Sequence, residues 1–192
     1  ILLMLPFMMI LAAKNQVILF FLVLVLVIWN YIHVSVKAKV IIIAASLLIA
    51  VGIGVLNEQL RYRFVDELAQ TLGERLILWD AGKEIILDNP VGGVGLGDTD
   101  DEVNKILLRD KNDKLFNYNL HNQYLDYWVM LGTIGLIAFL IILAAPLKYG
   151  DLLFKIFILI IGVSLLTESM LLRQKGLVFF LLFYGLCGAS YS

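Results

Sequence analysis

One polar stretch decides the fold. It runs from Asn57 to His121 and has the sequence NEQLRYRFVDELAQTLGERLILWDAGKEIILDNPVGGVGLGDTDDEVNKILLRDKNDKLFNYNLH. It holds 13 of the 16 Asp and Glu residues and 8 of the 15 Lys and Arg residues, whereas the sequence on both sides is almost entirely apolar. Segments buried in lipid must be apolar and must hydrogen-bond their own backbones, while chemistry on polar substrates needs charge and water. We therefore expect the function to lie in this stretch and in the helix ends beside it.

The flanking sequence predicts a membrane protein. With 61% hydrophobic and 16% charged residues and a mean hydropathy of +0.91, the chain lies outside the range of ordinary soluble domains. A hydrocarbon core of roughly 30 Å takes about 20 helical residues. The sequence predicts five spans and a shorter N-terminal one. The uncharged runs that carry them are residues 1–13, 16–32, 40–56, 129–147, 156–167 and 176–192.

These features predict an all-α fold, a polytopic bundle of transmembrane helices with a large, partly helical loop. The predicted domains are transmembrane helices over residues 1–56, the catalytic loop over 57–121, and transmembrane helices over 122–192. The chain opens at Ile1 inside an apolar run with no basic region before it, which indicates the C-terminal half of a larger membrane protein. Four basic residues in the short connections on one side against three on the other barely favour an external loop.

Inside the loop, apolar residues recur near the helical period and predict a helix over Gly73–Leu87. Asp88-Asn89-Pro90 ends it, because the residue before a proline disfavours the helical conformation. Val91–Gly97 then predicts a tight glycine turn, and Asp98–Leu115 a polar, lid-like stretch. The acidic side chains at four-residue spacing on the helix are expected to form a solvated face.

The glycine turn does not match a nucleotide-binding motif. Gly93, Gly95 and Gly97 miss the pattern GxGxxG because Asp98 stands at its last glycine position, and no GK[ST] is present. The alternative is that glycines here let the backbone approach a bulky substrate.

Metal and nucleophile patterns are also missing from the sequence. The acidic run after the turn lacks the glycine and the glutamate of a calcium loop, since Val103 and Arg109 stand at those positions. No His, Cys and Asp cluster has metal-ligand spacing, and no GxSxG is present. The lone Cys187 permits no intramolecular disulfide. We expect no metal, no cofactor and no nucleic-acid partner.

The basic side chains at the start of the loop have two interpretations. Arg61 and Arg63 come within seven residues of a span's end, and Arg75 opens the loop helix. One interpretation makes them interfacial anchors or salt-bridge partners of neighbouring glutamates. The other has their guanidinium forks bind a phosphate or diphosphate at the membrane surface. His121 likewise fits either a helix cap at the interface or a catalytic base, whereas His33 is expected to be interfacial.

Four segments together resemble the O-antigen ligase and O-antigen polymerase superfamily. They span residues 74–136, about a third of the chain, and read ERLILWDAG (74–82), NPVGGVGLG (89–97), HNQYL (121–125) and LGTIGL (131–136). Thr167-Glu168-Ser169 before a final span fits too. The family's short Ser-Arg motif corresponds here to Ala13-Lys14-Asn15, which departs from it.

The resemblance implies an enzyme of bacterial surface-polysaccharide assembly, including lipopolysaccharide. It implies a multi-pass protein of the inner (cytoplasmic) membrane whose large loop is periplasmic, that is, extracytoplasmic. The donor would be a glycan on undecaprenyl diphosphate, and the acceptor a glycan or lipid A core. By resemblance, Arg75 and His121 are the catalytic residues. The expected substrate-binding residues are Arg61, Arg63, Asn122, Gly93, Gly95, Lys14 and Glu168.

The predicted reaction moves a glycan from undecaprenyl diphosphate to a sugar hydroxyl without a metal. A histidine base at His121 would be worth about 10²–10⁴ in rate, and Arg75 would stabilise the charge that develops on the diphosphate. One alternative is a transporter or exporter of lipid-linked polysaccharide. The predicted spans are almost free of ionisable residues, which argues against proton-coupled transport. Another alternative is a structural membrane subunit.

Overall fold

The structure is a computed structural model that describes residues 21, 24–30, 32–56 and 58–189, with the side chains of residues 50 and 53–69 left out. Among the described residues, every regular element is a helix and no strand occurs, which confirms the all-α class. The chain divides into two compact units, residues 1–72 and 73–192.

The first unit contains a helical segment over residues 24–30, helix α3 (Val36–Leu56) and the beginning of α4. Helix α3 starts where the hydroxyl of Ser35 accepts a hydrogen bond from the amide of Ala38 at 3.3 Å. Its interior is apolar except for Ser46, whose hydroxyl donates to the carbonyl of Ile42 at 2.7 Å. That bond satisfies the hydroxyl within its own helix, as an apolar environment requires.

Helix α4 (Glu58–Asp88) confirms the predicted loop helix and extends it toward the N-terminus. It ends at Asp88, two residues before Pro90, as the proline predicts. Only some of the apolar positions of this helix face the core. Leu72 and Leu76 are 47% and 54% exposed, and the residues that face the core are Leu78, Ala81, Ile85 and Ile86. The apolar positions of this helix cover more than one face, so the period alone does not select the buried one.

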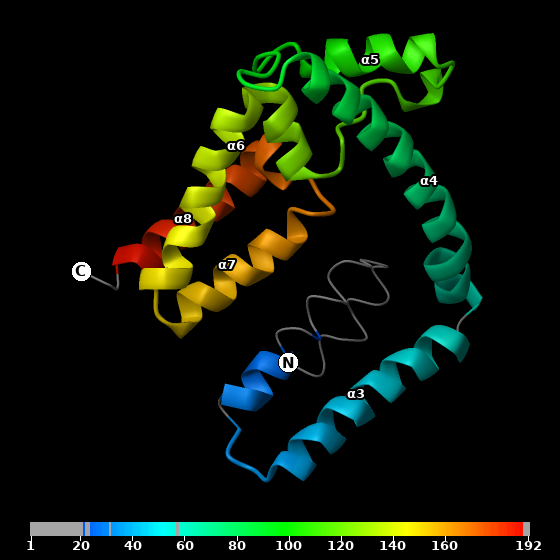
Figure 1. Cartoon of the computed structure of the whole chain (residues 1–192). Helices are drawn as coiled ribbons and strands as arrows, with labels where there is room; N and C mark the ends of the chain where they lie inside the picture. Colours follow the sequence, from blue (N-terminus) through cyan, green and yellow to red (C-terminus); the bar gives the residue numbers. More distant parts are fainter. Residues whose placement is uncertain (1–20, 22–23, 31, 57, 190–192) are drawn as a thin grey trace. The chain divides into compact units, whose positions relative to one another are not determined.

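After α4, the described part of the second unit contains six α-helical and 3₁₀ elements. In order they are α5 (Thr99–Arg109), η1 (Asp113–Leu115), α6 (Gln123–Tyr149), α7 (Leu152–Ser164), η2 (Met170–Leu172) and α8 (Gln174–Ala189) (Figure 1). The predicted glycine turn occupies the connection between α4 and α5. The predicted polar, lid-like stretch is the helical pair α5 and η1.

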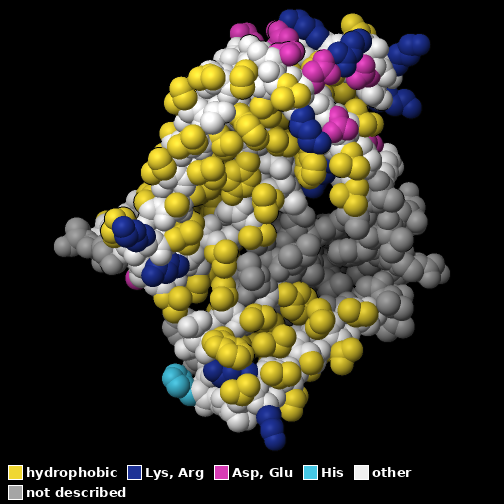
Figure 2. Space-filling model, in the orientation of Figure 1, with side chains coloured by type: hydrophobic (Ala, Val, Ile, Leu, Met, Phe, Trp, Pro, Cys, Tyr) yellow, Lys and Arg dark blue, Asp and Glu magenta, His cyan; other side chains and the backbone are white. Residues whose placement is uncertain are grey.

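Two clusters of buried apolar side chains hold this unit together. The first joins α4, α5 and the start of α6 through Leu78, Ile85, Ile86, Val103, Leu107, Leu115, Leu120 and Val129. The second joins α6, α7, η2 and α8 through Phe139, Leu143, Phe154, Ile158, Ile161, Leu165, Leu171 and Phe180. In Figure 2 hydrophobic side chains cover the surface over α6 and α7, whereas charges gather around α5.

Helix α6 is broken at Gly132, which has φ 66° and ψ −169°. In a regular helix the amides of Thr133 and Ile134 would bond to the carbonyls of Val129 and Met130. The break leaves these four groups without helical partners, and the glycine turn supplies new ones. Thr133 donates to Pro90 at 2.9 Å and Ile134 to Val91 at 3.5 Å, while Val94 and Gly95 donate to Val129 and Met130 at 2.9 Å each. We call this exchange of backbone bonds the Gly132 interlock.

The break folds α6 back on itself. Tyr124 and Phe139 are 15 positions apart, which in a straight helix is about 22 Å. Their ring centroids lie 5.9 Å apart, and those of Tyr127 and Phe139 lie 4.7 Å apart. The helix therefore has two limbs, residues 123–131 and 133–149, and Figure 1 shows them running side by side.

Apolar helices occupy the described parts of the predicted spans. Among the described residues, α6 is the one helix long and apolar enough to cross a membrane when its length is counted across the break at Gly132, whereas α7 and α8 are apolar but shorter. The second limb of α6 has 17 residues, a length of about 25 Å. A multi-pass topology and the side on which the loop lies stay predictions.

We predict that Gly132→Ala strongly destabilises the protein. A Cβ at this position would lie 2.1 Å from the carbonyl oxygen of Val91, and the backbone conformation is one that only glycine adopts readily. Thermal unfolding of the purified protein in detergent measures the effect, with an expected loss of several degrees or no folded protein. Gly73→Ala is the matched control, because its Cβ meets nothing within 4 Å and alanine favours the helix by about 1 kcal/mol. Equal melting temperatures for the two variants would contradict the prediction.

Candidate functional site

Three ionisable side chains from distant parts of the second unit meet at one place. Arg75 comes from α4, His121 from the loop before α6, and Glu168 from the loop between α7 and η2. The Nη2 atom of Arg75 lies 3.5 Å from Oε1 of Glu168, and Nδ1 of His121 lies 3.9 Å from Oε2. The carboxylate of Glu168 therefore stands between the two residues that the sequence analysis singles out as catalytic.

The three side chains are only partly accessible to solvent. Arg75 is 14% exposed, His121 26% and Glu168 42%. Within the described part of the chain, Nε of Arg75 and Nδ1 of His121 are buried and make no hydrogen bond. A third buried nitrogen, Nε2 of Gln123, is also unpaired. Folded proteins satisfy nearly all their buried polar atoms, so the unpaired atoms of Arg75 and His121 are available to a polar ligand.

The pKa of the Glu168 carboxyl lies below its ordinary value. The imidazole of His121 is the largest cause, and the guanidinium groups of Arg75 and Arg173 act in the same direction against an opposing effect of burial. The carboxylate is therefore charged at neutral pH and faces the guanidinium of Arg75.

His121 is held by the turn that leads into α6. Its backbone has φ +49°, which is unusual for a residue other than glycine, and its amide donates to the side chain of Asn119 at 3.1 Å. The next residue, Asn122, caps α6 by accepting from the amides of Tyr124 and Leu125 at 3.1 and 3.2 Å. The capping bonds explain an asparagine at this position, and a role for Asn122 in substrate binding stays a prediction.

Gly93 and Gly95 bring the backbone of the glycine turn close to that of α6. Both have positive φ, and a Cβ on Gly93 would lie 2.5 Å from the backbone of Met130. Their role in binding a substrate stays a prediction. Arg61 and Arg63 belong to α4, but their side chains are not described, and Lys14 lies outside the described residues.

Three buried polar residues around the site were not among the predicted site residues. Gln123, Asp126 and Ser169 are 0%, 1% and 2% exposed. Gln123 and Asp126 lie on the first turn of α6, three positions apart, immediately after the His121-Asn122 pair. Polar residues at this spacing at the start of an apolar helix indicate a buried polar contact, and that signal was available in the sequence.

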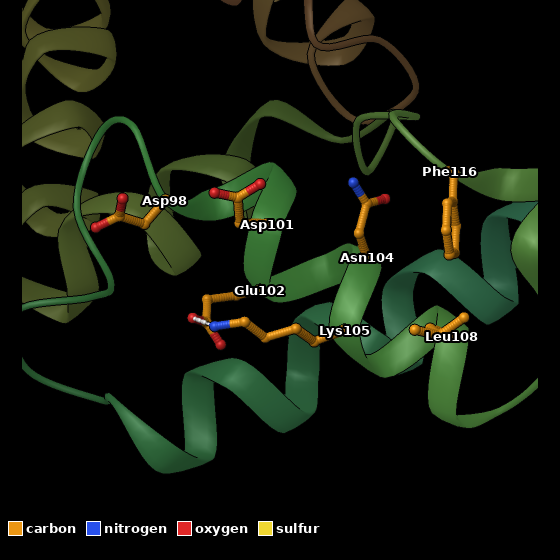
Figure 3. Close-up of a pocket in the computed structure, with 7 residues that line it drawn as sticks. All are labelled: Asp98, Asp101, Glu102, Asn104, Lys105, Leu108 and Phe116. Atoms are coloured by element: carbon orange, nitrogen blue, oxygen red, sulfur yellow. Dashed lines mark hydrogen bonds and ion pairs between the residues drawn. The ribbon is translucent and has the colours of Figure 1, made fainter.

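Two hollows open on the second unit. A hollow of about 520 Å³ beside α5 is lined by Asp98, Asp101, Glu102, Asn104, Lys105, Leu108 and Phe116 (Figure 3). Its one cation, Lys105, is paired with Glu102 at 2.5 Å, so three carboxylates would repel a phosphate. No group of three or more His, Cys, Asp and Glu residues in the described part of the chain is placed to hold a metal ion.

The other hollow is an apolar groove of about 300 Å³ between α6 and α7. It is lined by Tyr124, Leu140, Leu143, Ala144, Leu147, Ile158, Leu159, Gly162, Val163 and Leu166. Two of the lining residues, Tyr124 and Leu166, lie within three positions of His121 and Glu168, respectively, in the sequence. The hydroxyl of Tyr124 donates to the carbonyl of Gly162 at 2.9 Å.

The fold and the site define an all-helical protein that has a partly buried cluster of Arg, His and Glu and an apolar groove. A family model described as O-antigen ligase matches residues 1–140. The chain belongs to the O-antigen ligase family. Membership supports a glycosyltransferase-type role in bacterial polysaccharide biosynthesis at the inner membrane.

A protein of Haemophilus influenzae described as uncharacterized is 34% identical over 82 residues. The match covers 41% of this chain and 20% of that relative, so the chain spans about a fifth of the length of the curated relative that it matches. No solved structure matches the chain.

We predict that Glu168→Gln lowers stability at neutral pH and that the difference from wild type shrinks in acid. A carboxyl whose pKa is lowered by folding stabilises the protein above its unfolded value, about 4.3, and loses this contribution as the pH falls through the lower folded value. Thermal unfolding of the purified protein across a pH series measures it.

The same substitution in a His121→Ala background is the control. Because the imidazole is the main cause of the shift, the effect of Glu168→Gln should be smaller there. A stability difference that is the same at every pH would contradict the assignment.

Proposed function

We propose that the chain carries the catalytic site of a membrane glycosyltransferase of the O-antigen ligase or polysaccharide polymerase type. In this proposal the site transfers a glycan from undecaprenyl diphosphate to a hydroxyl of an acceptor glycan or of the lipid A core. The observation that supports it is the meeting of Arg75 and His121 at the carboxylate of Glu168.

His121 serves as the general base. Its Nδ1 faces Glu168, so Nε2 is the nitrogen available to take the proton from the acceptor hydroxyl. The hydroxyl oxygen then forms a bond to the anomeric carbon of the donor sugar. Glu168 stabilises the imidazolium that results, as a carboxylate does for the base of a hydrolytic triad. The separation of 3.9 Å would shorten when substrate is bound.

Arg75 serves the leaving group. As the bond between the anomeric carbon and the diphosphate oxygen breaks, the electron pair goes to that oxygen and negative charge develops there. A guanidinium with a buried, unbonded Nε can donate to a diphosphate without first breaking a hydrogen bond at that atom. Charge stabilisation by such fixed donors requires no metal. Arg61, Arg63 and Lys14 are proposed to contribute further positive charge.

The apolar groove is proposed to hold the isoprenoid tail of the donor. Its lining is almost entirely aliphatic, and two lining residues, Tyr124 and Leu166, are close in sequence to His121 and Glu168. A lipid lying there would place its diphosphate near Arg75 and His121. This arrangement requires that residues 57–121 face the periplasm and that the helices over 1–56 and 122–192 cross the inner membrane, which we propose as the topology.

We predict that His121→Ala lowers the rate of glycan transfer by about 10²–10⁴, because it removes a general base. The measurement is release of undecaprenyl diphosphate from a lipid-linked glycan by the purified full-length protein, together with formation of the glycosylated acceptor. His33→Ala, the exposed second histidine, is the control and should retain the wild-type rate.

Two outcomes would overturn the proposal. Full activity of His121→Ala would remove the base. A wild-type protein that moves lipid-linked glycan across the membrane without cleaving it from the diphosphate would be an exporter.

A further inference from the structure

Among the residues whose side chains are described, one carboxylate is buried, and it is bonded to the neighbours of two site residues. Asp126, in the first turn of α6, is 1% exposed. One of its oxygens, Oδ1, accepts a hydrogen bond from the amide of Leu120 at 3.2 Å. The other, Oδ2, accepts from the hydroxyl of Ser169. These two donors are the immediate chain neighbours of His121 and Glu168, so one side chain ties together the two loops that carry them.

The same contact reaches α4. While the amide of Leu120 donates to Asp126, its carbonyl accepts from Nε1 of Trp79 at 2.8 Å. Trp79 lies four residues after Arg75, one turn further along α4. Each of the three ionisable side chains of the site therefore has a residue nearby in the sequence that is hydrogen-bonded to Asp126 or to Leu120.

Gln123 holds the loop of Glu168 from both ends. Its amide donates to the carbonyl of Leu165 at 2.9 Å, and its side-chain oxygen accepts from the amide of Leu171 at 2.7 Å. With the bond from Asp126 to Ser169 in the middle, the first turn of α6 contacts this loop at three points. The loop that carries Glu168 is thus built onto the same turn that follows His121.

We propose that Asp126 is the positioning residue of the site. It sets the separation of His121 and Glu168 through hydrogen bonds to their neighbours and does not act on the substrate. Both its oxygens are occupied by Leu120 and Ser169, and the carboxylate that pairs with His121 in the described structure is that of Glu168. In this role the two hydrogen-bond acceptors of Asp126 hold the loops in place, and its protonation state does not take part in the reaction. A proton carrier would have to change its protonation state.

The inference rests on the proposed transfer reaction, and its test compares two substitutions in the full-length protein. Asp126→Asn keeps an oxygen for Leu120 and offers an amide N–H to the Ser169 oxygen, so kcat should stay within a few-fold of wild type. Asp126→Ala removes both bonds, and the displaced base should lower kcat by about 100-fold while KM for the donor changes little. Asp151→Ala is the matched control, since that carboxylate accepts the amide of Phe154 at the start of α7, and it should keep wild-type kcat.

A second readout does not depend on activity. Diethylpyrocarbonate modifies exposed imidazoles, and the exposed His33 supplies an internal reference in every sample. The rate for His121 relative to His33, followed by mass spectrometry, should rise severalfold in Asp126→Ala and stay at the wild-type value in Asp126→Asn and Asp151→Ala.

The outcomes separate the two proposals. A wild-type protein without transferase activity would contradict the proposed function, while the labelling result would still test the positioning role. If wild type is active and His121→Ala is not, a normal kcat or normal labelling in Asp126→Ala would overturn the role of Asp126. Loss of activity in Asp126→Asn equal to that in Asp126→Ala would show that the charge itself is needed, and would also overturn it.

Discussion

The organisation of the second unit depends on the Gly132 interlock. A helix broken in an apolar setting exposes backbone groups that cost about 1–3 kcal/mol each when left unpaired. The turn after α4 pairs all four of them, two as acceptor and two as donor. Two glycine-rich segments about 40 residues apart are therefore halves of one contact. Gly93 and Gly132 are needed because a side chain on either would strike the backbone of the other segment.

The interlock also determines where the charged residues lie. The interlock turns α6 back, so that its second limb packs against α7. The first limb can then contact both the loop before α6 and the loop after α7. The polar side chains of the first limb, Gln123 and Asp126, accept hydrogen bonds from the loops before α6 and after α7. Arg75 joins through the bond between Trp79 and Leu120. The Gly132 interlock, which consists of backbone hydrogen bonds alone, thus helps to bring the side chains of Arg75, His121 and Glu168 together.

Much of this could be predicted from the sequence, and the remainder has a physical reason. Segregation of charge predicted the helical class, Pro90 marked the end of α4, and the family resemblance named Arg75, His121 and Glu168. The break in α6 was not predicted, because Leu131-Gly132-Thr133 reads as an ordinary stretch of an apolar helix. Its partner lies in another segment, and only a tertiary contact makes the break favourable.

The central claim is that Arg75, facing Glu168 and His121, binds the diphosphate of a lipid-linked donor. The most direct measurement is the affinity of the purified full-length protein for undecaprenyl diphosphate, compared between wild type, Arg75→Gln and Lys83→Gln. Lys83 is an exposed cation on the same helix, paired with Asp80. Loss of a charged hydrogen-bond donor costs about 1.5–3 kcal/mol, so Arg75→Gln should weaken binding by about tenfold or more, whereas Lys83→Gln should leave it unchanged. Equal affinity for all three proteins would contradict the claim.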